Sequence, residues 1–249
     1  MRTTKRRGRT IKADISGQRD LFSVCSLLLK VIVALAILVV NTIAAASADT
    51  FRNSCEKTVG AGKVVVTYID SETIYNSSHS TKSLQSRTAK SSDSYHSIYG
   101  LTHAEPSFRL EIRSRLLVNA DGQTCMVPDV SVKLGFSAMH VYLAKELGDS
   151  CRKNIVREHE LEHVSTWKSH FRIGAKMLKE PLRAAFSRPR HYSSEKEAQA
   201  DLKPWVEEVL KPLQHKLVNS VMDAQRAIDA PASYERVRQR LYMCLAGNS

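Results

Sequence analysis

Residues 154–167 read NIVREHELEHVSTW, and their pattern determines the expected architecture of the chain. The apolar and histidine side chains in this stretch recur every three or four residues, which is the period of one face of an α-helix. The same spacing continues to Leu178, and Pro181 is expected to stop the helix. We therefore predict a long helix after Gly148 that packs one face against the rest of the fold.

The chain ahead of this helix is rich in strand signals. Residues 63–69 are β-branched, and residues 108–118 and 129–136 alternate apolar with polar side chains. Residues 140–144 are expected to form one further short strand. Residues 76–97 are so rich in Ser, Thr and Lys that they predict a mobile loop without a core.

The chain after the motif helix has helical spacing. Apolar side chains recur at this spacing from Leu202 to Val221, where Pro204 and Pro212 are expected to break or kink the helix into shorter pieces. A last helix fits the residues from Tyr234 onward. The order predicts an α+β fold, in which an N-terminal, twisted, mostly antiparallel sheet packs on the motif helix and an α-helical C-terminal half follows.

The first 48 residues have the composition of an export signal. A basic segment is followed by an apolar stretch and by a small-residue run that ends at Ala48. An uncleaved inner-membrane anchor is the alternative, and either reading places the rest of the chain outside the cytoplasm, as a periplasmic or secreted protein. Residues 49–249 are then expected to form one domain, with a β-rich half at 49–147 and an α-rich half at 148–249.

The positive charge of the chain is divided between two regions. The whole sequence carries +12, and residues 1–48 carry eight Lys/Arg and two Asp, so the remainder holds 12 − 6 = +6. This surplus suits an anionic envelope surface or an acidic substrate. We expect no nucleic-acid partner, and no stable membrane span if the signal is cleaved.

The cysteines beyond the export segment are Cys55, Cys125, Cys151 and Cys244. An even number in an exported domain predicts two disulfides, with three possible connectivities. We expect Cys55–Cys244, which would join the two ends of the mature chain, and Cys125–Cys151, which would join the β-rich half to the motif helix. Cysteine ligands for zinc are the alternative, but the sequence contains no C-x-x-C pair.

The run His159-Glu160-Leu161-Glu162-His163 matches H-E-x-x-H inside the predicted helix. Residues four apart lie on one helix face, so both imidazoles can bind one Zn²⁺. Glu160 lies about 100° round the helix, where it would act as a general base toward water rather than as a ligand. Ordinary helix histidines paired with the two glutamates are the alternative.

A catalytic zinc site needs a third protein ligand, because three ligands leave one position open. Glu197 is the expected third ligand, and Asp201, four residues further on, would accept the ring N–H of a ligand histidine. The alternative is a capping box, in which Ser194 begins a helix and Glu197 bonds back to that start. Glu195 and Glu180 are further candidates for the third ligand.

Three more residues bear on this site. His191 and Tyr192 precede Glu197 closely enough that one of them could stabilise an oxyanion, although loop His and Tyr usually serve packing. His170 lacks the glycine turn that would return it to the metal, and it is expected to be a partly exposed helix residue. No G-x-S-x-G nucleophile motif occurs in the sequence.

The H-E-x-x-H motif followed by Glu197-x-x-x-Asp201 resembles the gluzincin branch of the zincin metallopeptidases. More narrowly, residues 151–164 look like a family of bacterial predicted secreted zinc-dependent proteases, and the resemblance covers about residues 125–201. It implies a zincin-like fold and Zn²⁺ as cofactor. It also implies an edge strand, residues 140–144, that would align an extended peptide or protein substrate by strand addition.

The chain departs from the gluzincin pattern in one spacing. The interval from His163 to Glu197 is 197 − 163 = 34 residues, which is longer than in the best-known gluzincins. The metzincin pattern is absent, because Ser169 stands where its third histidine belongs.

These features predict an exported zinc metallopeptidase that hydrolyses envelope or extracellular proteins. A zinc amidase acting on peptidoglycan would use the same chemistry and is one alternative. The other is a non-catalytic envelope protein that keeps the fold as a binding or structural module.

Overall fold

The computed structural model describes residues 50–87 and 98–246, so the predicted export segment, residues 1–48, lies outside the described residues. The chain divides into two compact units, Met1–Ser54 and Cys55–Ser249. In the described part of the chain, no helix is long and apolar enough to cross a membrane.

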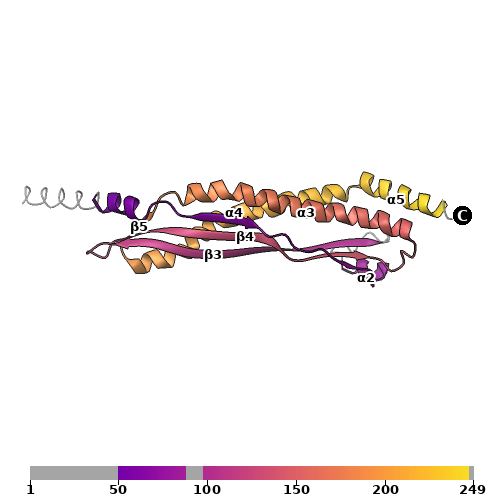
Figure 1. Ribbon diagram of the computed structural model, residues 1–249, viewed down its shortest axis with the longest axis horizontal. Helices are drawn as coiled ribbons and strands as arrows, with labels where there is room; N and C mark the ends of the chain where they lie inside the picture. Colours follow the sequence, from indigo (N-terminus) through magenta and orange to yellow (C-terminus); the bar gives the residue numbers. More distant parts are fainter. Residues whose placement is uncertain (1–49, 88–97, 247–249) are drawn as a thin grey trace, which may run out of the picture. The chain divides into compact units, whose positions relative to one another are not determined.

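A five-stranded mixed sheet is organised around β4 (Thr124–Leu143), because every other strand pairs with it. The long strand β3 (Gly100–Val118) lies antiparallel along one side of β4 (Figure 1). Along the other side lie β5 (Arg190–Tyr192), which is antiparallel, and then β1 (Val64–Tyr68) and β2 (Ile74–Asn76), which are parallel. The longest pairing is therefore antiparallel, and the predicted strands at 63–69, 108–118 and 129–136 are confirmed within these bounds.

Residues 140–144 are not the edge strand that was expected. His140–Tyr142 belong to β4 and lie between β2 and β3, so both of their backbone edges are paired. The pairing register shifts opposite Glu105/Pro106, and the side chains of β4 that are buried change from residues 130, 132 and 134 to residues 139, 141 and 143. Such an irregularity reverses the inward face, which is why one strand resembles two in the sequence.

A short helix, α2 (Thr81–Gln85), lies within the segment that was expected to be a mobile loop. The Ser80 hydroxyl caps it by accepting a hydrogen bond from the Ser83 backbone N–H, and Leu84 is fully buried. One buried leucine and a cap thus order a segment whose composition is otherwise polar. Residues 88–97 of the predicted loop lie outside the described residues.

The motif helix, α3 (Ser150–Ala185), begins where the Asp149 carboxylate accepts a hydrogen bond from the Arg152 backbone N–H. It lies along the sheet (Figure 1). Phe171 packs against Phe136 of β4, with ring centroids 4.7 Å apart. Pro181 was expected to stop the helix, but α3 continues past it to Ala185.

The turns on either side of Pro181 remain buried through Leu178, Leu182 and Phe186. We attribute the continuation of the helix to this burial, which offsets the backbone hydrogen bond that proline cannot donate.

Helix α4 (Glu195–Ile228) also runs through its prolines, so the expected break at Pro204 and Pro212 is wrong. Trp205, Val206 and Leu210 are buried between and beside the prolines, and their packing holds the helix together.

Helix α4 lies antiparallel to α3, and the two approach closely. A Cβ atom on Gly174 of α3 would lie 2.6 Å from Leu217 of α4. The predicted last helix is present as α5 (Pro231–Ala246), and Asp229 lies between the two C-terminal helices.

The structure has two disulfides, as expected, but the expected pairing is wrong. The bonds are Cys55–Cys125 and Cys151–Cys244, in place of Cys55–Cys244 and Cys125–Cys151. Cys125 begins the central strand beside the segment that leads into β1. Cys151 begins α3, and the C-terminal end of α5 lies next to it. Two disulfides are consistent with an oxidising compartment outside the cytoplasm.

An ion pair fixes β3 and β4 to the segment ahead of β1. The Arg115 Nε donates to both oxygens of Asp129, at 3.2 and 3.0 Å. The same guanidinium donates to the backbone carbonyls of Val59 and Ala61, and the Lys63 backbone N–H donates to Asp129 at 2.7 Å. Burial raises the pKa of Asp129, but these hydrogen bonds lower it by more than burial raises it. The pKa of Asp129 is therefore below its ordinary value.

Candidate metal centre

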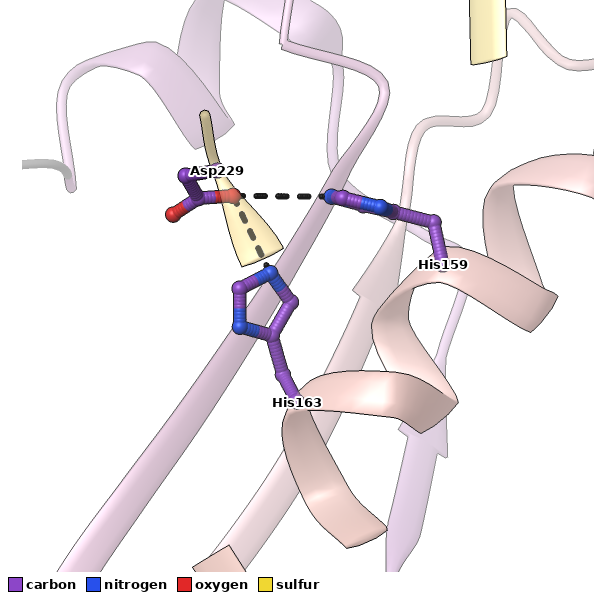
Figure 2. A group of neighbouring side chains, drawn as sticks. All are labelled: His159, His163 and Asp229. Carbon is purple, nitrogen blue, oxygen red and sulfur yellow. Dashed lines mark hydrogen bonds and ion pairs between the residues drawn. The ribbon is translucent and has the colours of Figure 1, made fainter. Parts of the chain in front are cut away.

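Two imidazoles and one carboxylate converge where α3 meets the end of α4. The Asp229 Oδ1 lies 3.1 Å from the His163 Nε2 and 3.5 Å from the His159 Nε2 (Figure 2). One potential ligand atom from each of the three residues lies within 4.8 Å of the others. Both histidines are buried, whereas the Asp229 side chain is 44% exposed, so the cluster is open to solvent on the aspartate side.

The secondary structure explains why these three side chains meet. His159 and His163 are one helical turn apart on α3, and their rings are perpendicular, with centroids 5.0 Å apart. Asp229 is the residue at which α4 ends, and the antiparallel packing of α4 on α3 brings that end to the histidines. Pro231 then begins α5, which leaves the Asp229 side chain at the junction of the two helices.

Gln225 orients His163. Its Nε2 donates to the His163 backbone carbonyl at 3.1 Å, and since a carbonyl can only accept, the amide oxygen faces the ring. That oxygen contacts the His163 Nδ1, which must therefore carry the proton. When the ring is neutral, Nε2 is therefore the nitrogen without a proton, which is the form in which histidine binds metals.

Glu160 lies beside the cluster in a tight, buried setting. The Thr102 hydroxyl of β3 donates to Glu160 Oε2 at 2.8 Å, and the same oxygen of Thr102 lies 3.0 Å from the Glu160 backbone carbonyl oxygen. Gly100 leaves room for the carboxylate, because a Cβ atom there would lie 2.4 Å from Glu160 Oε1. Burial raises the pKa of Glu160, although the nearby histidines act in the opposite direction.

Tyr234, in the first turn of α5, also reaches the cluster. Its hydroxyl donates to Asp229 Oδ1 at 3.2 Å, and its ring centroid lies 5.7 Å from that of His159. Burial and the Asp229 carboxylate raise the pKa of the Tyr234 hydroxyl, so it remains a hydrogen-bond donor.

The charges of the cluster suit a cation. Burial raises the pKa of Asp229, but the hydrogen bonds from His159 and His163 lower it more, and the carboxylate stays ionised. Burial lowers the pKa of His163, but the bonds to Asp229 and Gln225 raise it more. A proton and a divalent cation would thus compete for the His163 Nε2 beside the Asp229 carboxylate.

Glu197 is not with the histidines, which contradicts its expected place as third ligand. Its carboxylate accepts hydrogen bonds from the backbone N–H and the hydroxyl of Ser193, and Ser194 caps α4 by accepting from the Glu197 N–H. The helix start is therefore capped by serine, in line with the alternative reading of this segment, although Glu197 bonds to Ser193 rather than to Ser194.

The start of α4 lies far from the metal cluster along the sheet. Strand β5, just before α4, pairs with β4 at Thr124, whereas Thr102 beside Glu160 pairs with Val141. These positions are 141 − 124 = 17 residues apart on one strand, or roughly 56 Å at about 3.3 Å per residue. No side chain spans that length, so Asp229 takes the position expected of the third ligand.

The other predicted site residues gather around Glu197 instead. Asp201 accepts hydrogen bonds from the Tyr192 hydroxyl at 2.7 Å and from Arg190 at 3.0 Å, and not from a ligand histidine. His191, Tyr192, Glu197 and Asp201 line one open pocket at this end of the sheet. Neither His191 nor Tyr192 can therefore act on a substrate held at the histidines.

The reserve candidates also lie elsewhere. Glu180 pairs with Arg183 on the same helix at 2.9 Å, and Glu195 is in the first turn of α4. His170 is a partly exposed helix residue, as predicted, and its Nδ1 contacts the Thr166 backbone carbonyl at 2.9 Å.

Three residues of the cluster were missed in the sequence: Asp229, Gln225 and Tyr234. A signal for the first two exists, since Gln225 and Asp229 are four residues apart, just after the helical pattern that was followed to Val221, and Pro231 comes next. The same spacing at Glu197 and Asp201 competed with it, and nothing in the sequence showed which helix end faces the motif.

No family model, no curated protein and no solved structure matches this chain. The functional interpretation therefore rests on the residues of the cluster and their geometry.

Proposed function

We propose that this chain is an exported zinc-dependent metallohydrolase, a peptidase in which His159, His163 and Asp229 hold Zn²⁺ and Glu160 is the general base. The observation that carries the proposal is the convergence of two buried imidazoles from an H-E-x-x-H motif with one carboxylate, their ligand atoms within 4.8 Å of one another.

The donor set favours zinc over the hard cations. Ca²⁺ and Mg²⁺ prefer sites made of oxygen alone, whereas two imidazole nitrogens and one carboxylate oxygen are a common set for catalytic zinc. Gln225 supports this assignment, because a ligand histidine usually donates its other ring N–H to a fixed acceptor. Three protein ligands would leave one coordination position free, as a catalytic site requires.

The residues around the ligands have the roles that peptide hydrolysis needs. When bound, Zn²⁺ supplies a Lewis acid that polarises a carbonyl and makes water a stronger nucleophile. Glu160 would take the proton from the attacking water, and its raised pKa suits passing that proton to the leaving amine.

An extended peptide is the substrate form that the sheet favours. With His140–Tyr142 paired on both sides, the edge next to Glu160 is that of β3, which in the described part of the chain pairs with β4 alone. Gly100 and Thr102 of this strand touch Glu160 directly. A substrate strand added along this edge would run past the general base, as the resemblance to zincins also implies. We place this activity in the periplasm or the medium, which the two disulfides support.

The proposal is tested with casein, a substrate without stable structure. Zinc-loaded protein should cleave casein, and removing zinc with 1,10-phenanthroline should stop the cleavage. Glu160→Gln should keep its zinc and lose turnover by about 10²- to 10⁴-fold.

Glu162→Gln is the matched control, because Glu162 lies on the same helix and is exposed to solvent. Equal turnover in the two variants would contradict the assigned base. Stoichiometric zinc without casein cleavage would contradict the peptidase and favour the alternative, an amidase that cleaves peptidoglycan. Purified cell-wall fragments would then be the substrate to test.

A further inference from the structure

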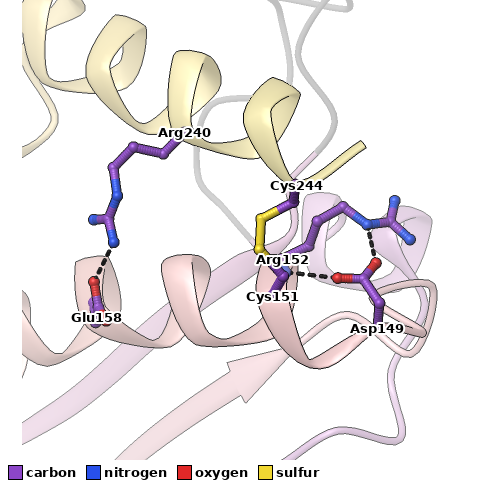
Figure 3. Close-up of a disulfide and its surroundings, with 6 residues drawn as sticks. All are labelled: Asp149, Cys151, Arg152, Glu158, Arg240 and Cys244. Carbon is purple, nitrogen blue, oxygen red and sulfur yellow. Dashed lines mark hydrogen bonds and ion pairs between the residues drawn. A yellow bond between two sulfur atoms is a disulfide. The ribbon is translucent and has the colours of Figure 1, made fainter. Parts of the chain in front are cut away.

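Helix α5 is attached to the start of α3 at three points. Cys244 forms a disulfide with Cys151, and Arg240 forms an ion pair with Glu158 at 2.6 Å (Figure 3). The third point is Tyr234, whose ring centroid lies 5.7 Å from that of His159. The two helices run antiparallel, so these attachments lead from the N-terminal end of α3 toward the metal cluster.

The rest of α5 contributes little to its own docking. Among its described side chains only Ser233 and Cys244 are buried, and Tyr234, Tyr242 and Met243 are 54%, 60% and 73% exposed. The Arg240–Glu158 pair is more than half exposed on both sides, and such pairs stabilise weakly. The disulfide is therefore the main tether that keeps α5 on α3.

We infer that Tyr234 is a positioning residue of the metal centre, and that the Cys151–Cys244 disulfide, by holding α5 on α3, sets how tightly that centre binds its metal. This inference rests on the proposed metal centre. Tyr234 donates to the same oxygen of Asp229 that faces both histidines, and its ring covers His159. When α5 is released, the two histidines and Gln225 stay on α3 and α4, while Asp229 loses the contact that restrains its side chain.

The size of the effect follows from the residue that the tether keeps in place, because Tyr234 holds the side chain of Asp229. Loss of a residue that orients a metal ligand weakens metal binding by about 10- to 100-fold. We therefore expect zinc affinity to fall within that range when the disulfide is absent.

The redox step is a thiol–disulfide exchange. The Cys151 and Cys244 thiols lose two protons and two electrons to a disulfide donor, either a protein oxidant of the export compartment or oxidised glutathione. A thiolate of the pair attacks the donor disulfide, which forms a mixed disulfide and frees one donor sulfur as a thiolate. The second thiolate then attacks the cysteine sulfur of the mixed disulfide, and the other donor sulfur leaves. A protein oxidant ends as a dithiol, and oxidised glutathione ends as two glutathione molecules. The centre would thus bind zinc weakly in the reducing cytosol and tightly after export, which keeps the hydrolase inactive where it is made.

The two disulfides provide a matched comparison. Cys55–Cys125 lies at the end of β4 far from the metal cluster, so its loss should not change zinc binding. Zinc affinity of the full chain is measured by competition with a chelator for wild type, Cys151→Ser/Cys244→Ser and Cys55→Ser/Cys125→Ser, with circular dichroism as the control for folding. We expect a 10- to 100-fold loss in the first double variant alone. In the oxidised protein, Tyr234→Phe should show part of this loss, and Tyr242→Phe on the same helix should show none.

A second measurement needs no variant. Because coupling between two equilibria is reciprocal, zinc should stabilise the Cys151–Cys244 disulfide by the same factor by which the disulfide strengthens zinc binding. The protein is equilibrated in glutathione redox buffers at fixed free Zn²⁺, and the free thiols are alkylated and located by mass spectrometry. Zinc should move the reduction midpoint of Cys151–Cys244 to a more reducing buffer and leave that of Cys55–Cys125 unchanged.

The outcomes separate this inference from the proposed function. Tight zinc binding in wild type and in Cys151→Ser/Cys244→Ser alike, with no zinc-dependent shift of the reduction midpoint, would overturn the coupling and leave the zinc centre standing. Absence of zinc binding in the oxidised wild type would overturn the metal centre itself.

Discussion

Gly100→Ala tests the placement of the general base without touching a metal ligand. The added methyl would lie 2.4 Å from Glu160 Oε1, 2.6 Å from Val156 Cγ1 and 2.8 Å from Glu160 Cγ. Real Cβ atoms do not approach other heavy atoms closer than 3.0 Å, so the carboxylate must move by at least 3.0 − 2.4 = 0.6 Å. Both residues of α3 are buried, so the displaced carboxylate stays within the protein interior.

The expected consequences differ for stability, metal binding and turnover. Overpacking of a buried site costs about 1–3 kcal/mol of the free energy of unfolding. A displacement approaching 1 Å in a catalytic group lowers turnover by about 10²-fold. Zinc affinity should stay at the wild-type value, because the methyl meets neither His159, His163 nor Asp229 among its three nearest atoms.

The assay compares kcat on casein, zinc affinity by chelator competition, and the thermal unfolding midpoint. Gly148→Ala is the control, because a Cβ at that position has no neighbouring atom within 4 Å. Undiminished kcat in Gly100→Ala, in protein that is folded and zinc-loaded, would refute the role of Glu160 inferred from its contact with β3.

Three further perturbations have defined outcomes. Gln225→Met removes the acceptor at the His163 ring and should weaken zinc binding about 10- to 100-fold in chelator competition. Gln225→Glu keeps an acceptor but loses the N–H that bonds the His163 backbone carbonyl, so its loss of affinity should be smaller. Asp129→Asn should lower the free energy of unfolding at pH 7 by roughly 1–3 kcal/mol. Since Arg115 holds the pKa of Asp129 below its ordinary value, this contribution is lost as the pH falls through the lowered pKa, and urea unfolding should show the gap to wild type narrowing below about pH 4. Glu197→Gln should bind zinc with the affinity of wild type, and a strong loss of affinity would show that Glu197 is a zinc ligand after all.

The sequence carried the local structure of the chain more clearly than its long-range pairings. The β-branched run at 63–69, the alternation at 108–118 and the helical spacing of α3 each reflect burial of one face, which leaves a direct trace in the residue pattern. The predicted stop at Pro181 was wrong because tertiary packing outweighed the local cost of proline. The register shift in β4 made one strand look like two in the sequence, because a single bulge reverses the alternation of buried and exposed side chains.

The residues of the candidate site also divide into those set by local spacing, which were predicted, and those brought in by long-range packing, which were not. His159, Glu160 and His163 were identified because all three lie on one helix at a fixed spacing. Asp229 comes from another helix, 66 residues beyond His163. Its contact depends on how α4 packs on α3, for which spacing along the chain is no guide. The predicted disulfide pairing was wrong for the same reason, since Cys244 meets Cys151 only because α5 packs antiparallel to α3.

Metal analysis of the purified protein tests the central claim most directly. After loading with Zn²⁺ and dialysis, wild type should retain about one zinc per chain, and His159→Ala and His163→Ala should retain none. Asp229→Ala should bind zinc much more weakly than wild type, and His170→Ala, which changes another histidine of the same helix, should retain one zinc. Stoichiometric zinc in His163→Ala, or none in wild type, would contradict a metal centre built on these residues.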